Sequence, residues 1–352
     1  MERTRRYPRI ALACLVALSQ WACGGASDDG AEGPEFLDSG AGTVLRIETE
    51  FDEILPANYR IERIAAGFVF AEGPLWVRRG QWPGLPFLAF SDVRNNALYR
   101  WNPQDRGVAE ILRPVFTGVT ENDWSAGPAG LALDASGNLL ICEQGERRIG
   151  LLTPSGARSV FVDHFEEKRL NSPNDLVWGP DGWLYFTDPP FGLKEQDEDP
   201  EKELDFNGIF RASADGQTVE LLADGQSRPN GIGFSPDGQY LYVSNSDPYR
   251  KNWMRYPIGE DGSVGPGRVF YDVTSNNEEG LPDGLVLDQD GRIYAAGPGG
   301  VWVFSPDGSY IGAIRPNEPP ANVAWGNEGK TLYMTARTGV YRIQLNVQGL
   351  IN

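Results

Sequence analysis

The stretch Pro229-Asn230-Gly231-Ile232 shows the pattern that decides the fold: a bend, one variable residue, a small residue and an apolar strand. The same pattern recurs, so that the chain holds six copies in all. The other copies are Ala71-Glu72-Gly73-Pro74-Leu75-Trp76, Pro128-Ala129-Gly130-Leu131, Pro173-Asn174-Asp175-Leu176, Pro282-Asp283-Gly284-Leu285 and Pro320-Ala321-Asn322-Val323. Because each copy places one residue at an equivalent point, the repeat can gather distant positions of the chain into one site.

Each copy is followed, about seven to ten residues later, by a turn and a second apolar strand. The turns end in glycine at 84, 137, 182, 238, 291 and 329. The strands expected after them cover 87–90, 139–141, 183–186, 240–243, 292–294 and 331–333. Such turns between apolar runs are typical of β-hairpins. Intervals of 38 to 56 residues, with roughly four strands in each, indicate the blades of a propeller.

These repeats predict an all-β fold, a single six-bladed β-propeller. The 43 glycines and 26 prolines suit a turn-dense all-β chain, and no convincing amphipathic helix follows the leader. The last blade has room for three strands, over 320–325, 331–335 and 339–345. The alternating stretch over 59–64 can supply its fourth strand, so that an N-terminal strand closes the ring. A β-sandwich is the alternative, but a sandwich has no reason to repeat one motif six times.

The N-terminal segment resembles an export signal. Four arginines up to Arg9 precede an apolar run over 10–18 that is too short to span a bilayer. The chain of 352 residues could hold two average domains, but six blades use about 300 residues as one unit. We therefore expect a signal peptide over 1–22, a flexible Gly/Ser/Asp-rich tether over 23–43 and a propeller hydrolase domain over 44–352.

The position of Cys23 indicates a signal of the lipoprotein type. It follows the small residue Ala22 and opens a flexible polar stretch, which resembles a bacterial lipoprotein leader with Cys23 as the acylated first residue. We therefore expect export to the periplasm or the surface of a bacterium, with membrane contact only through a lipid on Cys23. A secretory signal that is simply cleaved is the alternative.

The charge of the chain argues against a nucleic-acid partner. The formal net charge is −18, and loss of residues 1–22 makes it more negative by three, because four arginines and Glu2 leave. Nucleic-acid phosphates need a basic surface. An acidic surface instead suits solubility and an attraction for divalent cations. The acidic run over 195–201 is expected to be an exposed loop between blades.

Several kinds of chemistry are excluded by the residues that the chain lacks. His164 is the only histidine, and no G-x-S-x-G stretch is present, so a Ser-His-Asp triad has no support. A zinc site with several imidazoles is impossible for the same reason. No glycine-rich phosphate loop opens a helix. Cys142 falls in a predicted strand, where a buried apolar thiol is expected. Carboxylate and amide oxygen chemistry around a hard metal remains.

The variable positions of the repeat supply such oxygens. In a propeller the innermost strand of each blade runs along the central channel, so Glu72, Asn174, Asn230 and Asp283 are expected to ring one mouth. Two carboxylates and two amides make a site that Ca²⁺ would neutralise, although another divalent cation is possible. The alternative is that these side chains cap strand ends or fill turns, which Asn and Asp also favour.

A family resemblance is carried by motifs in all six blades. The motifs are Ala71-Glu72-Gly73-Pro74-Leu75-Trp76, Phe90-Ser91-Asp92, the stretches over 168–175 and 184–192, Arg228-Pro229-Asn230-Gly231, Leu281-Pro282-Asp283-Gly284 and Lys330-Thr331-Leu332-Tyr333. From about residue 60 onward the chain resembles the SMP-30/gluconolactonase/LRE-like family, and its bacterial gluconolactonases in particular. The resemblance implies a metal-dependent six-bladed propeller that hydrolyses sugar lactones. It implies metal ligands at Glu72, Asn230 and Asp283, with Asn174 on the metal or the substrate.

The resemblance also implies substrate contacts and departures from the family pattern. Asn174, Asp175 and Gln144 are expected to contact the substrate. Members of this branch often carry Asn where this chain has Ala129 and His near Gln144, and some animal relatives have Arg at the position of Ser172. These positions line the same mouth, so they bear on the choice of substrate.

A mechanism follows from the residue types. Ca²⁺ would bind the lactone carbonyl oxygen and stabilise the charge that develops there. Asp283 would activate the attacking water and later protonate the leaving alkoxide, or would attack directly as a nucleophile. Two other functions stay open: a different hydrolase, acting on aryl esters, quorum-sensing lactones or organophosphates, and a non-enzymatic propeller that binds a partner or glycan.

Overall fold

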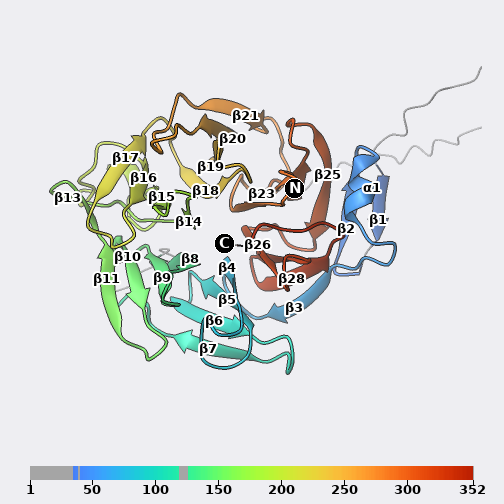
Figure 1. The fold of residues 1–352 in the computed structure, drawn as a ribbon, viewed down its shortest axis with the longest axis horizontal. Coiled ribbons are helices and arrows are strands. Elements are labelled where there is room, and N and C mark those ends of the chain that lie inside the picture. The colour runs from blue at the N-terminus through green and yellow to red at the C-terminus, as the bar shows by residue number, and fades with distance from the viewer. Residues whose placement is uncertain (1–34, 39, 119–125, 352) are drawn as a thin grey trace, which may run out of the picture. The chain divides into compact units, whose positions relative to one another are not determined.

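The computed structural model describes residues 35–38, 40–118 and 126–351. In this part of the chain six antiparallel sheets form the blades of a ring (Figure 1). Five of these sheets have four strands, and the sheet of blade 5 has six because β1 (Glu35–Asp38) and β2 (Gly42–Arg46) extend it. The predicted six-bladed propeller is therefore confirmed. The expected signal peptide over 1–22, and Cys23, lie outside the described residues.

The first three blades follow one another along the chain. Blade 1 contains β4 (Ala71–Val77), β5 (Phe87–Asp92), β6 (Ala97–Trp101) and β7 (Val108–Leu112). Blade 2 contains β8 (Pro128–Leu133), β9 (Leu139–Glu143), β10 (Arg148–Leu152) and β11 (Arg158–Val162). Blade 3 contains β14 (Leu176–Trp178), β15 (Leu184–Asp188), β16 (Gly208–Ala212) and β17 (Val219–Ala223). The small hairpin of β12 (His164–Phe165) and β13 (Lys168–Arg169) lies between blades 2 and 3 in the sequence.

The other three blades complete the ring. Blade 4 contains β18 (Pro229–Phe234), β19 (Tyr240–Asp247), β20 (Arg250–Pro257) and β21 (Arg268–Asp272). Blade 5 contains β22 (Leu285–Leu287), β23 (Ile293–Gly297), β24 (Gly300–Phe304) and β25 (Tyr310–Pro316). Blade 6 contains β26 (Asn322–Gly326), β27 (Thr331–Ala336), β28 (Gly339–Gln344) and, as its outermost strand, β3 (Glu62–Ala66). The chain segment that precedes blade 1 thus pairs with the last blade.

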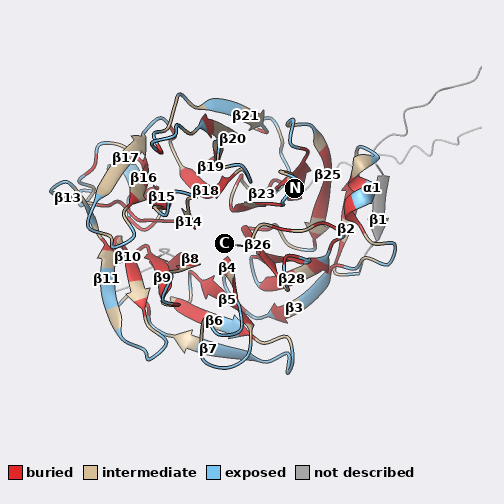
Figure 2. Cartoon of the chain, viewed as in Figure 1, coloured by how far each residue is buried: buried red, intermediate tan, exposed pale blue. Residues whose placement is uncertain are grey.

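Neighbouring blades are held together by apolar clusters. Alternate residues of a strand point to opposite faces, and each face of a blade packs on a different neighbour. In β9, Leu140 and Cys142 pack toward blade 3, whereas Leu139 and Ile141 pack toward blade 1. Cys142 is fully buried, as predicted, and burial raises the pKa of its thiol. Figure 2 shows that exposure is concentrated in the outermost strands, such as β7 and β21.

The region before β3 contains strands and a short helix, whereas the sequence predicted a flexible tether up to residue 43 and no helix after the leader. The sequence predicts a flexible segment up to residue 43, but β2 (Gly42–Arg46) pairs with β25, and β1 (Glu35–Asp38) pairs with β2. The one-turn helix α1 (Glu50–Ile54) then buries Phe51 and Ile54 in the cluster between blades 5 and 6. Apolar side chains before residue 60 therefore make this segment part of the folded unit.

The acidic run contains a 3₁₀ turn over Gln196–Glu198. Asp197 in this turn forms a salt bridge with Arg228 and accepts a hydrogen bond from Asn207 at 2.9 Å. The loop is thus anchored to blade 4. Neither of the short helical segments in the described ranges has the length and apolar character needed to cross a membrane.

Candidate metal and active site

The variable residues of the repeat lie where the innermost strands begin. Three of these strands have a register shift at that point, next to Glu72, Pro128 and Pro229. Such bulges bend a strand and redirect its side chains, and they are frequent beside active sites. The irregularity follows from the bend and small residue that open each copy of the repeat.

Hydrogen bonds between neighbouring blades hold these positions at a similar level along the axis of the ring. The amide of Gly130 donates to the Asn174 carbonyl, and that of Gly284 donates to the Ala321 carbonyl, each at 2.8 Å. Hydroxyl groups on the second strand of a blade add further hydrogen bonds between blades. Thr187 Oγ1 donates to the Asn230 carbonyl at 2.8 Å, in the next blade. The backbones of Asn174, Asn230 and Ala321 are thus each held by a neighbouring blade.

The small residue of the repeat is required by the close approach of neighbouring blades. A Cβ atom on Gly73 would lie 2.0 Å from the Ala129 carbonyl oxygen. A Cβ atom on Gly231 would lie 2.3 Å from the Asp283 carbonyl oxygen. Both distances are far shorter than real contacts, so only glycine fits at these points.

Glu72, Asn230 and Asp283 come together at the start of their strands. Asn230 Nδ2 donates to Ser246 Oγ at 2.9 Å, which leaves Asn230 Oδ1 free to face elsewhere. In the described structure, Asn230 Oδ1 and Asp283 Oδ1 are buried oxygens without a hydrogen-bond partner. One oxygen of Glu72 accepts a hydrogen bond from the Gly73 amide. Two buried oxygens therefore lack the partner that such atoms normally have.

The carboxyl groups at this point have strongly shifted pKa values. Burial raises the pKa of Glu72 to about 7, while the Gly73 amide and the side chains of Asn322 and Asp283 oppose this rise. Burial and the charge of Glu72 raise the pKa of Asp175 to about 8. Burial, followed by the charges of Glu72 and Asp175, raises the pKa of Asp283 well above its usual range. A cation among these groups would reverse these shifts.

The residues fit a hard divalent cation with mixed ligands. Across the described ranges, no three His, Cys, Asp or Glu side chains are close enough to hold a metal by themselves. Amide oxygens would therefore have to complete the ligand set, and Asn230 Oδ1 is such an oxygen. Carboxylates with amide oxygens suit calcium better than zinc.

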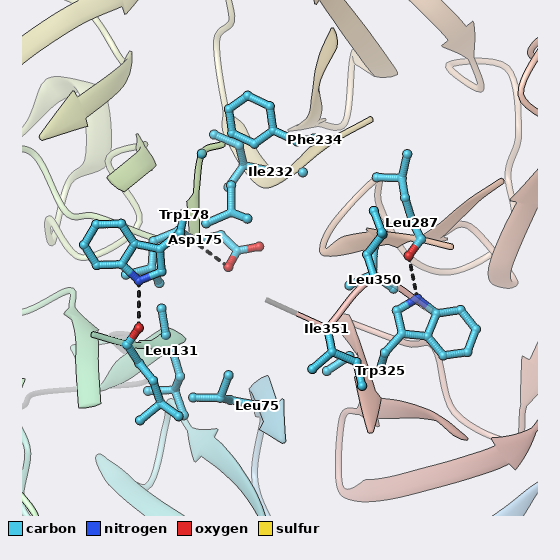
Figure 3. Close-up of a pocket in the computed structure, with 18 of the residues that line it drawn as sticks. Leu75, Leu131, Asp175, Trp178, Ile232, Phe234, Leu287, Trp325, Leu350 and Ile351 are labelled. Atoms are coloured by element: carbon cyan, nitrogen blue, oxygen red, sulfur yellow. Dashed lines mark hydrogen bonds between the residues drawn. The ribbon is translucent and has the colours of Figure 1, made fainter. Parts of the chain in front are cut away.

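The remaining predicted residues occupy different places. Asn174 is buried, and its backbone pairs with Thr187 and Gly130, which sets it at the same level of blade 3. The side chain of Asp175 points instead into the cavity between the innermost strands, which is described below (Figure 3). Gln144 is buried just after β9, and its Oε1 has no partner in the described part of the chain.

Two residues that the sequence analysis did not single out support the ring. The hydroxyl group of Ser246 accepts a hydrogen bond from Asn230 Nδ2 and donates one to the carbonyl oxygen of Pro282, the residue before Asp283. Asp188 accepts hydrogen bonds from the Asn171 and Ser172 amides at 2.7 Å each, and thereby holds the loop before Asn174. A signal for the second was present, because a hydroxyl-Asp pair ends the second strand in both Ser91-Asp92 and Thr187-Asp188.

A cavity lies toward the other end of the innermost strands. Its volume is about 800 Å³, and mainly apolar residues line it, among them Leu75, Trp178, Phe234 and Ile351 (Figure 3). None of the four predicted metal ligands, all of which the structure describes, lines this cavity. Asp175 and Asn322 do line it, so they lie between the predicted metal ligands and the cavity.

Comparison with known proteins assigns the family. The sequence profile described as SMP-30/Gluconolactonase/LRE-like region matches residues 70–338, which include all six copies of the repeat. The chain belongs to the SMP-30/gluconolactonase/LRE-like family. The resemblance stated from the motifs is thereby confirmed.

Individual members of the family resemble this chain over most of its length. The gluconolactonase of Zymomonas mobilis is 37% identical over 320 residues, which are 88% of this chain and 87% of that protein. The diisopropyl-fluorophosphatase of Loligo vulgaris is 26% identical and covers 75% of this chain and 85% of its own. The structure of a gluconolactonase from Xanthomonas campestris superposes with a TM-score of 0.74 at 29% identity, over 90% of this chain and 99% of that one.

Proposed function

We propose that this protein is a lactone hydrolase that opens sugar lactones by the attack of water, in the manner of a gluconolactonase. The observation that carries the proposal is the pair of buried, unpartnered oxygens of Asn230 and Asp283 beside Glu72. This arrangement occurs in a chain that is 37% identical to a gluconolactonase over most of both sequences. Fold alone would not support an activity, so the proposal also rests on these buried oxygens and on the identity to a gluconolactonase.

Glu72, Asn230 and Asp283 would hold a divalent cation, for which we propose Ca²⁺, and Asn174 would complete the ring. When bound, the cation would polarise the lactone carbonyl and lower the pKa of the carboxyl groups around it. Ser246 would keep the oxygen of the Asn230 amide directed at the ring, because it already accepts from the nitrogen of that amide.

Asp283 is the residue that we propose as catalytic. Its carboxylate would take a proton from water as the water oxygen bonds to the carbonyl carbon. It would return this proton to the ring oxygen as the carbon–oxygen bond breaks, so that the hydroxy acid leaves and Asp283 is regenerated. Direct attack by Asp283 on the carbonyl carbon is the alternative, with a covalent ester that water then opens.

Substrate contacts are proposed for Asn174 and Gln144. Gln144 carries a buried oxygen without a partner in the described ranges, and a sugar hydroxyl could donate to it. Asp175 was also predicted to contact substrate. Its side chain borders the cavity on the other side of the ring, which favours a supporting role for it.

A calcium titration coupled to a lactone panel tests the proposal. We expect the purified protein to release acid from glucono-lactone, to lose this activity with a chelator, and to regain it with calcium. Paraoxon and homoserine lactones serve as competing substrates in the same assay. If calcium binds but no compound of the panel is turned over, the proposed function is wrong and a non-enzymatic binding propeller is favoured.

A phosphotriesterase-type hydrolase is the second candidate. The observation that favours it is the 26% identity to a diisopropyl-fluorophosphatase over 75% of this chain. Faster turnover of paraoxon than of any lactone in the same panel would select this candidate.

We also propose that the protein is exported and anchored by a lipid on Cys23. The basic and apolar leader and the small residue before Cys23 support this proposal. Mass spectrometry of the mature N-terminus from the producing cell would distinguish a diacylated Cys23 from a chain cleaved without lipid. Replacement of Cys23 by Ala should release an anchored protein from the membrane fraction.

A further inference from the structure

The copies of the repeat in blades 3 and 6 lack the small residue that the other copies have. Four copies have glycine after the variable residue, whereas blade 3 has Asp175 and blade 6 has Asn322. Both side chains are buried, and Asn322 Nδ2 lies 3.5 Å from Asp175 Oδ2. The two polar side chains therefore meet across the channel, between the ring of predicted ligands and the cavity.

The Asn322 amide has a fixed orientation. Its Oδ1 accepts a hydrogen bond from the Val323 amide at 2.8 Å, so its Nδ2 is the atom that faces the carboxyl groups. One of these groups belongs to Asp175. The other is Glu72, whose pKa the Asn322 side chain lowers in opposition to burial. The Asn322 side chain thus lies beside two carboxyl groups, one from blade 1 and one from blade 3.

Two glycines make room for these side chains. A Cβ atom on Gly284 would lie 1.9 Å from Asn322 Oδ1, and the next two atoms it would meet also belong to the Asn322 side chain. A Cβ atom on Gly130 would lie 2.6 Å from Asp175 Oδ1. Gly284 therefore provides the space in which the Asn322 amide rests.

We propose that Asn322 is a positioning residue: its amide nitrogen joins the carboxylates of Glu72 and Asp175 and holds Glu72 in the orientation of a metal ligand. The inference rests on the proposed function, because it assumes the divalent cation at the ring. Partners of this kind orient ligands without touching the metal, and their loss weakens binding. Asn322 in blade 6 would thereby complete a site whose ligands come from blades 1, 3, 4 and 5.

The first test is calcium binding by the full chain with Asn322→Ala, measured by calorimetry. We expect an affinity about tenfold weaker than that of the unchanged protein. At saturating calcium, kcat should return close to the unchanged value, because Asn322 does not touch the reacting atoms. Asn346→Ala removes an exposed amide from the same blade and is the matched control, with unchanged affinity.

A double-mutant cycle with Gly284→Ala makes the test specific. Gly284→Ala alone should weaken calcium binding, because its methyl group displaces the Asn322 amide. The double variant should bind calcium about as well as Asn322→Ala alone, since the displaced group is then absent. Wild-type affinity in Asn322→Ala, or fully additive losses in the double variant, would overturn the inference. Lack of calcium binding by the unchanged protein would overturn the proposed function itself.

Discussion

The amide nitrogen of Asn230 donates a hydrogen bond to Ser246 Oγ at 2.9 Å, and this bond decides which way the amide faces. An asparagine side chain has one acceptor oxygen and one donor nitrogen. Because the nitrogen is hydrogen-bonded to Ser246, the oxygen is left without a hydrogen-bond partner in the described structure, as the proposed ligand role requires. Ser246 is itself fixed, since its hydroxyl donates to the Pro282 carbonyl.

Replacement of Ser246 by Ala should therefore weaken metal binding. Without the acceptor, the Asn230 amide can turn its nitrogen toward the ring, and we expect calcium affinity to fall by about tenfold. Calorimetric titration measures the change. Ser155→Ala, at an exposed turn of blade 2, is the control and should leave the affinity unchanged. Equal affinities for the two variants would show that Ser246 does not orient the ligand.

Asp283→Asn should remove lactone turnover while the fold is kept. The amide cannot accept the proton of water, so we expect kcat to fall by a factor of about 10² to 10⁴. Glucono-lactone hydrolysis followed by acid release measures the loss, and circular dichroism reports on the fold. Full activity in this variant would exclude Asp283 both as general base and as nucleophile.

Calcium should change how the stability of the protein depends on pH. Without metal, burial raises the pKa of Glu72 to about 7, and burial with the charge of Glu72 raises that of Asp175 to about 8. Between their ordinary pKa of about 4 and these values, the folded state holds protons that the unfolded chain has released. The free energy of unfolding should therefore fall as pH rises through this range.

Calcium opposes this fall, because it binds the ionised carboxylates and must displace their protons at low pH. The calcium-induced rise in Tm should be larger at about pH 8 than at about pH 5. Thermal unfolding with calcium and with chelator at both pH values measures it. Burial also raises the pKa of Asp188 to about 7. Its contribution to stability is the same with calcium and with chelator, so it does not affect the calcium-induced change in Tm. A calcium effect that does not depend on pH would contradict the assignment of Glu72 as a ligand.

Gly231→Ala tests the close packing of neighbouring blades. Its Cβ atom would lie 2.3 Å from the Asp283 carbonyl oxygen, so blades 4 and 5 would have to separate. We expect a loss of about 1–3 kcal/mol in the free energy of unfolding, measured with urea. Gly225→Ala is the matched control, since its Cβ atom would have nothing within 4 Å. If both variants had a similar free energy of unfolding, the close packing at Gly231 would not contribute to stability.

The repeat was readable because it is local and regular. Recurring turns with apolar strands after them predicted the first residues of β5, β9, β15, β19, β23 and β27 to within one residue, although the observed strands extend two to four residues further. The segment before residue 44 was not readable in the same way. Its strands β1 and β2 belong to no copy of the repeat. β1 pairs with β2, and β2 pairs with β25, which is more than 250 residues away in the chain.

The candidate site shows the same division. Glu72, Asn230 and Asp283 share one phase of the repeat, so the sequence could place them at one level. Ser246 and Asn322 act through contacts with other blades, and neither occupies the variable position. The cavity also lies on the side of the ring away from the predicted ligands, which residue types alone do not indicate.

The sequence by itself determined the number of blades, the all-β class and the positions that can supply oxygen ligands, because each depends on spacing along one strand and turn. Only the tertiary structure decided which amide oxygen faces the ring, which carboxyl groups share the Asn322 amide and where the cavity lies. These features arise from contacts between blades that are far apart in the chain, and spacing along one strand and turn carries no information about such contacts.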